Sequence, residues 1–289
     1  IIGDIPIYVA MDSADTWANP WLFKLDEKNC PTQVAGCPPD GFSATGQLWG
    51  NPLYNWEVHR NSGYEWWIKR IANCFRLYDV VRIDHFRGFD EYYAIPYGDA
   101  TAENGWWEKG PGIDLFRAIS ASLGDREIIA EDLGYMTDSV KRLVEESGYP
   151  NMKVIEFAFD ERDTGNASDY LPHNYPRNCV VYTGTHDNET LLSWLEDITP
   201  AERRQVRKYL NNFKDSGKEL CDDLICLVMQ SVANLCIVPM QDYLGLDNSA
   251  RMNQPSTLGK NWKWRLKEGQ FTAELQKEML ELATRYGRR

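Results

Sequence analysis

The sequence has no apolar run long enough to cross a membrane. None of its segments approaches the roughly 20 consecutive apolar residues that a transmembrane helix needs. Basic residues are also few, since 31 lysines and arginines stand against 43 aspartates and glutamates, a formal net charge of -12 at pH 7. A surface of this sign repels phosphate backbones and anionic lipid headgroups. We therefore expect a protein that binds neither nucleic acid nor membranes.

Paired cysteine motifs are missing as well. The 7 cysteines are odd in number and include no C-x-x-C pair, which argues against a metal knuckle and against a disulfide framework. The chain begins at Ile1 inside an apolar stretch, without the basic region and cleavage site of a signal peptide. These features predict a cytoplasmic protein whose sequence starts within a fold.

Aromatic residues, by contrast, are abundant. They make up 12% of the chain, with 11 tryptophans and 15 tyrosines. Flat rings with polar edges suit sugar faces as well as protein cores, so this composition favours a carbohydrate ligand without deciding the matter.

Short β-rich runs alternate with longer segments of helical periodicity, which is typical of βαβ units around a parallel sheet. Each strand candidate is mostly apolar and is followed by polar residues, as buried parallel strands are. The candidate strands are 1–9, 80–85, 127–133, 153–159, 179–185 and 236–241. The candidate helices are 64–78, 113–123, 137–147, 189–196, 200–213, 219–235 and 271–286.

Six strands do not close an eight-stranded barrel. Either the sheet is open and doubly wound, or two further strands precede Ile1. Because the chain starts within an apolar strand, we favour the second alternative. The predicted fold class is α/β, a TIM (β/α)8-type barrel truncated at its N-terminus, with about six βα units. We expect residues 1–289 to form a single catalytic barrel domain.

The segment 37–55 interrupts this alternation. It is rich in proline, glycine and polar residues, and it carries Phe42, Trp49 and Tyr54. We predict a long irregular loop, because a long ordered loop is uncommon without a function. The alternative is a surface loop without a function. We favour a binding or lid loop, because aromatic side chains left exposed to water would be unfavourable.

Three predicted strands end in carboxylates, namely Asp84, Glu131 and Asp187. In a (β/α) barrel the carboxyl ends of all strands open on one face, so these side chains can converge there. Arg82 lies two residues before Asp84 and therefore on the same face of the strand. The adjacent guanidinium is expected to keep Asp84 ionised.

Such a pair of carboxylates is what retaining glycoside chemistry requires. Asp84 would attack the anomeric carbon, while Glu131, near apolar Ile129, would have a raised pKa and act as acid and then base. Asp187 would bind ring hydroxyls and stabilise the developing positive charge. The same pattern also describes Mg²⁺ sites that stabilise enolates, and loss of activity in a chelator would favour that alternative.

Two histidines lie beside these carboxylates, His85 next to Asp84 and His186 next to Asp187. Either could be an ordinary packed imidazole bonded to the backbone. We interpret both as candidates for contact with substrate hydroxyls, His186 more strongly.

The residues so far resemble those of a known family, the 4-α-glucanotransferases, also called amylomaltases or disproportionating enzymes, within the α-amylase group of barrels. The resemblance covers nearly the whole chain, and its motifs are specific in combination. They are the segments 3–9, 38–54, 82–88, 130–134, 185–188 and 251–253, the last followed by Pro255.

The resemblance implies transfer of an α-1,4-glucan segment to the 4-hydroxyl of glucose or another glucan, with retention, no cofactor and no metal. It assigns Asp84 as nucleophile, Glu131 as acid/base and Asp187 as transition-state stabiliser. Hydrolysis of α-glucans on the same site and a non-catalytic glucan-binding role are the alternatives. The positions implied to contact substrate are Asp4, Asp40, Gln47, Trp49, Arg82, His186 and Asn253.

Overall fold

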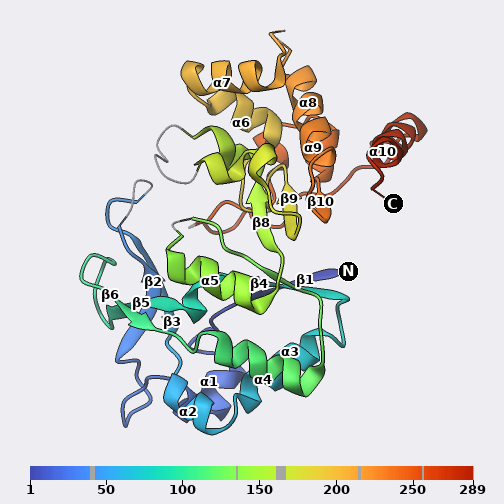
Figure 1. Cartoon of the computed structure of the whole chain (residues 1–289). Coiled ribbons are helices and arrows are strands. Elements are labelled where there is room, and N and C mark those ends of the chain that lie inside the picture. Colours follow the sequence, from blue (N-terminus) through green and yellow to red (C-terminus); the bar gives the residue numbers. More distant parts are fainter. Residues whose placement is uncertain (40–42, 135, 161–166, 214–215, 256, 289) are drawn as a thin grey trace. The chain divides into compact units, whose positions relative to one another are not determined.

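A computed structural model describes residues 1–39, 43–134, 136–160, 167–213, 216–255 and 257–288 (Figure 1). The chain divides into two compact units, unit 1 from Ile1 to Asn151 and unit 2 from Met152 to Arg289, and each is described by itself. The single barrel domain stays a prediction. In the described part of the chain, no helix has the length and apolar character that crossing a bilayer requires.

Unit 1 contains parallel strands in the order β1-β4-β7. Asp4 pairs with Arg82 and Ile83 pairs with Ala130, so the carboxyl ends of the three strands lie at one edge of the sheet. The next strand, β8, begins with Asn151 opposite Ala130. The strands are β1 (Ile2–Pro6), β4 (Val80–Asp84), β7 (Ile128–Ala130) and β8 (Asn151–Val154).

Helices α3, α4 and α5 supply apolar side chains to the core of unit 1. Trp67 and Ile71 from α3, Leu115 from α4 and Leu143 from α5 are buried in one cluster with Ile83 of the central strand. The helices of this unit are α1 (Ala14–Ala18), η1 (Pro20–Leu22), α2 (Trp56–Asn61), α3 (Glu65–Cys74), η2 (Phe86–Phe89), α4 (Ile113–Leu123) and α5 (Asp138–Ser147).

A second sheet of unit 1, four-stranded and antiparallel in the order β3-β2-β5-β6, was not predicted. Its strands are β2 (Gln33–Cys37), β3 (Gln47–Pro52), β5 (Glu91–Pro96) and β6 (Trp106–Lys109). The prediction that 37–55 lacks regular structure is therefore wrong for β3. Gly46 turns the chain with φ +68, and a register shift between Val34 and Gly36 accommodates the irregular sequence. Asp40 and Phe42 lie outside the described residues.

Unit 2 contains the remaining parallel strands, in the order β8-β9-β10. The strands are β9 (Cys179–Tyr182) and β10 (Leu235–Ile237), after β8, most of which lies in this unit. The helices are η3 (Ile155–Phe159), η4 (Ala167–Tyr170), η5 (Pro172–Asn174), α6 (Leu191–Asp197), α7 (Pro200–Leu210), α8 (Gly217–Met229), α9 (Met240–Tyr243), η6 (Asn248–Ala250) and α10 (Ala273–Arg285).

All three predicted strands of unit 2 are shorter than expected, and the one predicted at 179–185 ends at Tyr182. The strand predicted at 153–159 ends at Val154 and continues as η3, and the strand predicted at 236–241 ends at Ile237. Pro239 precedes α9 as its N-cap residue and cannot extend a ladder of strand hydrogen bonds. The six predicted strands nevertheless correspond to the six parallel strands found, which confirms the α/β class and the number of βα units.

Candidate active site

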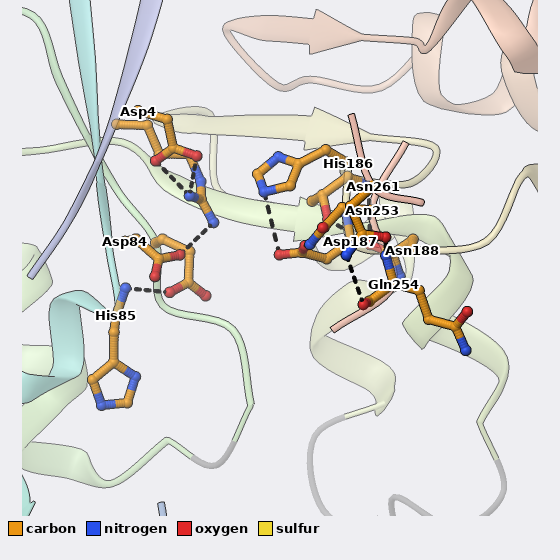
Figure 2. A network of polar contacts seen from close by, with 12 residues as sticks. Asp4, Asp84, His85, His186, Asp187, Asn188, Asn253, Gln254 and Asn261 are labelled. Carbon is orange, nitrogen blue, oxygen red and sulfur yellow. Dashed lines mark hydrogen bonds and ion pairs between the residues drawn. The ribbon is translucent and has the colours of Figure 1, made fainter. Parts of the chain in front are cut away.

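Arg82 is the centre of an ionic cluster at the carboxyl edge of the unit 1 sheet. Its Nη1 donates to both carboxylate oxygens of Asp4, at 2.7 and 2.8 Å, and its Nη2 lies 3.0 Å from Oδ1 of Asp84 (Figure 2). The guanidinium is buried, while both carboxylates are partly exposed. Charge-assisted contacts of this kind favour the ionised carboxylate and orient it. The predicted Arg82–Asp84 contact is confirmed.

Glu131, the residue after β7, lies in a different environment. Its side chain is buried, with 8% of its surface exposed. Oε2 accepts a hydrogen bond from the backbone N–H of His85 at 2.6 Å, and Oε1 accepts one from that of Leu133 at 2.9 Å. Burial and the charge of Asp84 raise the pKa of Glu131, Arg82 and the two N–H groups oppose this shift, and the net pKa is about 7. The carboxyl can therefore gain and lose a proton near neutral pH.

His85 contributes to this arrangement through its backbone. It adopts the left-handed conformation, with φ 53 and ψ 48, which is uncommon for a residue other than glycine. Its N–H is the group that donates to Glu131. Burial, together with the charge of Arg87, lowers the pKa of the imidazole to about 3. The centroid of this neutral ring lies 4.8 Å from the ring centroid of Trp49, and the two rings are nearly perpendicular.

A cleft of about 540 Å³ in unit 1 adjoins these residues. Asp84, His85 and Trp49 line it together with residues 6–10, Ser13, Asn51 and Arg70. The indole N–H of Trp49 donates to Oε1 of Gln47 at 3.0 Å, which links both predicted positions on β3 to the cleft wall. A ligand in this cleft would meet a carboxylate paired with a guanidinium, a neutral imidazole and an aromatic face.

Sequence reasoning missed several residues of this cleft, among them Tyr8, Asn51 and Arg70. Asn51 donates to the backbone oxygen of Val9 at 2.9 Å, and Arg70 donates to that of Ile7 at 3.0 Å. Tyr8 fell inside the strand predicted at 1–9, whereas β1 ends at Pro6 and Tyr8 follows it. Arg70 lies within α3, where nothing in the sequence distinguishes it from a solvated helical arginine.

In unit 2, Asp187 follows β9 and is held by neighbouring polar side chains. The Nδ2 of Asn253 donates to its Oδ1 at 2.5 Å, and Nε2 of His186 lies 3.3 Å from its Oδ2 (Figure 2). Arg251 donates to the backbone oxygen of Asp187 at 2.6 Å. The structure thus brings together the three residues predicted in this part of the chain.

The ring centroid of Trp262 lies 5.0 Å from that of His186. Sequence reasoning had given Trp262 no role. The main chain reinforces the same group, because Asn253 donates its backbone N–H to the oxygen of His186 at 3.0 Å. These contacts tie the segment that follows η6 to the residues after β9.

The histidine, cysteine, aspartate and glutamate residues that the structure describes form no group of three or more able to hold a metal ion. The charge near Asp84 is instead balanced by the guanidinium of Arg82.

Comparison with known proteins identifies the family. The family model for 4-alpha-glucanotransferase matches residues 1–272. The chain belongs to this family. It is 51% identical over 289 residues to the 4-alpha-glucanotransferase of Streptococcus pneumoniae serotype 4, covering 100% of this chain and 56% of that protein. It is 50% identical over 290 residues to the 4-alpha-glucanotransferase of Clostridium butyricum, of which it covers 58%.

A solved structure agrees with this assignment. The amylomaltase from Streptococcus agalactiae in complex with acarbose matches with a TM-score of 0.93 and 42% identity, over 99% of this chain and 57% of that one. The chain therefore spans about half the length of the family members it matches.

Proposed function

We propose that this chain carries the catalytic residues of a 4-α-glucanotransferase, which transfers segments of α-1,4-glucan between maltooligosaccharides with retention. One observation carries the proposal. Asp84 contacts a buried guanidinium, whereas Glu131 on the neighbouring strand is buried and has a pKa raised to about 7. Two carboxyl groups in opposite environments can divide the roles of nucleophile and acid.

In the first step, Glu131 gives its proton to the glycosidic oxygen while a carboxylate oxygen of Asp84 attacks the anomeric carbon. The bond to the leaving glucan breaks, and a covalent glycosyl ester forms on Asp84. Arg82, 3.0 Å from Asp84, keeps this nucleophile ionised and oriented. The step requires a separation of about 5 to 5.5 Å between the two carboxyl groups, which stays a prediction.

In the second step, the 4-hydroxyl of an acceptor glucan replaces the first product. Glu131, now a carboxylate, takes the hydroxyl proton as the oxygen attacks the anomeric carbon, and the ester bond to Asp84 breaks. A pKa of about 7 suits both proton transfers at neutral pH. Each attack inverts the anomeric centre, so the product retains the starting configuration.

Asp187 is assigned to stabilise positive charge on the sugar ring, with His186 and Asn253 orienting it. This role requires that Asp187 reach the same glucosyl unit as Asp84, as in the single barrel domain predicted from the sequence. The proposed substrate contacts are Asp4, Asp40, Gln47, Trp49, Arg82, His85, His186 and Asn253.

Transfer rather than hydrolysis needs a physical cause, because water can also attack the glycosyl ester. We assign this role to the segment 38–54, whose Trp49 lines the cleft beside His85. Exclusion of water by this segment would favour a glucan acceptor. Replacing Trp49 with Ala should therefore raise the ratio of hydrolysis to transfer, and an unchanged ratio would count against this role.

Incubation with maltotriose tests the proposed function. Glucose together with longer glucans is the expected result and indicates transfer. Glucose and maltose without longer products would indicate hydrolysis, and retention on an α-glucan column without turnover would indicate binding alone. Relatives of known function support α-glucans as the substrate class.

A cytoplasmic location remains our expectation from the cysteine content.

A further inference from the structure

A second buried glutamate, Glu156, lies in unit 2 at the start of η3. Only 4% of its surface is exposed, and its Oε1 has no hydrogen-bond partner in the described part of the chain. Burial of an incompletely bonded carboxyl destabilises a fold. An apolar residue of similar size would fill the same space without this cost, so the position of Glu156 calls for a reason.

Close packing and polar contacts connect Glu156 with the segment that carries Asp187. A Cβ atom on Gly184 would meet both Glu156 and Asn188, so the two side chains lie close together, and Asn188 opposes the rise in the pKa of Glu156. Oδ1 of Asn188 accepts from the backbone N–H of Thr185 at 2.9 Å and from its hydroxyl at 2.7 Å. Since this oxygen faces Thr185, the amide nitrogen is the group of Asn188 that can donate to Glu156.

The connection continues from Thr185 to Asp187. Oγ1 of Thr185 accepts a hydrogen bond from the backbone N–H of Asp187 at 3.3 Å. The hydroxyl therefore accepts from Asp187 and donates to Asn188, so its orientation depends on both neighbours. Fixing the amide of Asn188 thus helps to fix the main chain at Asp187.

Gly184 allows the close packing of Glu156 and Asn188. A Cβ atom at position 184 would lie 2.8 Å from Oε1 of Glu156 and 3.1 Å from Cβ of Asn188. Any side chain there would displace the glutamate or the asparagine, so a glycine is required by close packing at this point.

Burial makes a neutral Glu156 the favoured form, and the nearby carboxyl of Asp242 adds to this effect. The carboxylate of Asp242 accepts hydrogen bonds from the hydroxyl of Thr183 at 2.5 Å and from the backbone N–H of Leu191 at 2.9 Å. These two donors oppose the rise that burial causes in the pKa of Asp242. Burial raises the pKa of Glu156 well above its usual range, and the charge of Asp242 raises it further. A glutamine would have nearly the same shape and charge as this protonated glutamate.

We propose that Glu156 is a positioning residue for Asp187, acting through the amide of Asn188 and the hydroxyl of Thr185. Its kinetic consequence rests on the proposed function, since Asp187 is assigned to stabilise the transition state there. The structural consequence, an ordered main chain from Thr185 to Asn188, is independent of catalysis.

Two substitutions of Glu156 and a matched control test this inference. Glu156→Gln keeps an acceptor for Asn188, whereas Glu156→Met fills the space without one. The control is Glu202→Met, since Glu202 is a buried glutamate of the same unit that belongs to the capping box of α7. Both Met variants lose a buried glutamate, but only Glu156→Met breaks the connection to Asp187. Gly184→Ala probes the same contact from the other side.

The first measurement is amide hydrogen exchange in the segment 184–189, which requires no activity. We expect Glu156→Met and Gly184→Ala to reduce protection of Thr185 and Asp187 by on the order of 10-fold. Glu156→Gln and Glu202→Met should leave this segment as in the wild type. Unchanged exchange in Glu156→Met, or equal loss in Glu202→Met, would overturn the inference.

The second measurement is transfer from maltotriose. We expect Glu156→Met to lower kcat by about 10- to 100-fold with little change in KM, because misplacing a transition-state group costs rate rather than binding. Glu156→Gln should restore most of the lost rate, and a Gln variant as slow as the Met variant would contradict the inference. If the wild type itself shows no transfer, the proposed function fails, whereas hydrogen exchange still decides the role of Glu156.

Discussion

The acidic groups of the two units are held by different kinds of interaction. In unit 1, Asp84 contacts the buried guanidinium of Arg82, and Glu131 accepts hydrogen bonds from two backbone N–H groups while buried. In unit 2, the carboxylate of Asp187 contacts the imidazole of His186 and the amide of Asn253. A full positive charge orients the carboxylate of unit 1, whereas an amide and an imidazole orient that of unit 2.

This difference matches the chemistry proposed for each group. A nucleophile must stay ionised and an acid must hold a proton, so unit 1 separates the protonation behaviour of two neighbouring carboxyl groups. A transition-state stabiliser needs a constant charge at a defined place, which directional hydrogen bonds provide. If the two units divide the chemistry in this way, substitutions in unit 1 should change bond making and proton transfer. Substitutions in unit 2 should change the orientation of Asp187.

The largest effect is expected for Asp84→Asn. An amide cannot form the glycosyl ester, so transfer should fall by on the order of 10⁴-fold or more, while glucan binding persists. Turnover of maltotriose and binding by calorimetry measure the two properties. Asp79→Asn is the control, because Asp79 is an exposed aspartate that immediately precedes the same strand. Near wild-type turnover by Asp84→Asn would contradict the assignment of Asp84 as the nucleophile.

Glu131→Gln should have a large effect that depends on the leaving group. Loss of the general acid is expected to slow transfer from maltooligosaccharides by about 10²- to 10⁴-fold. A 4-nitrophenyl glycoside needs little protonation to leave, so its first displacement should be slowed much less. Burst kinetics would separate this displacement from the second one. Equal losses for both substrates would contradict the assignment of Glu131 as the acid.

Asn253→Ala should have a moderate effect that belongs to unit 2. The amide that orients Asp187 is lost, and kcat should fall by on the order of 10-fold, because misplacing a group that acts in the transition state lowers the rate. Asn261→Ala, in the same part of the chain, is the matched control because Asn261 contacts Gln254 and Thr257. If Asn253→Ala altered the pH dependence of kcat as strongly as a substitution in unit 1, the contrast between the units would be lost.

The smallest effect concerns stability. The pKa of Glu131 is raised to about 7, so the folded chain keeps a proton that the unfolded chain releases above its ordinary pKa near 4.5. The free energy of unfolding should therefore fall as pH rises from about 5 to 8.

Urea denaturation at both pH values checks this prediction. Glu131→Gln carries no titrating group at this position, so it should lose less stability than the wild type over the same interval. Parallel curves for the two proteins would contradict a raised pKa at Glu131 and would weaken the distinction between the two carboxyl groups of unit 1.

Local chemistry made much of this molecule predictable. The helix predicted at 137–147 is found as α5, because the hydroxyl of Thr137 accepts from the N–H of Val140 and Gly148 ends the helix in the left-handed conformation. The contact of Arg82 with Asp84 followed from strand alternation alone. Such features depend on residues within a few positions of one another, which the sequence displays directly.

The antiparallel sheet of unit 1 and the role of Glu156 could not be predicted in this way. Strand β2 pairs with β5 although 53 residues separate Cys37 from Glu91, and no local pattern specifies that partner. Glu156 was expected to lie in the strand predicted at 153–159, where nothing in the sequence distinguished it from other acidic residues. Its burial and its distance from Gly184 arise only when distant segments pack together.

The approximate positions of the six parallel strands, and the acidic residues that follow them, could be read from local patterns, because helix caps, strand alternation and apolar spacing act over short distances along the chain. What those residues can do chemically depends on the folded arrangement. Protonation at Glu131 depends on burial and on the charges of Asp84 and Arg82, and both depend on which strands lie side by side. Desolvation and electrostatic coupling act through space, and for that reason they become defined only once the chain has folded.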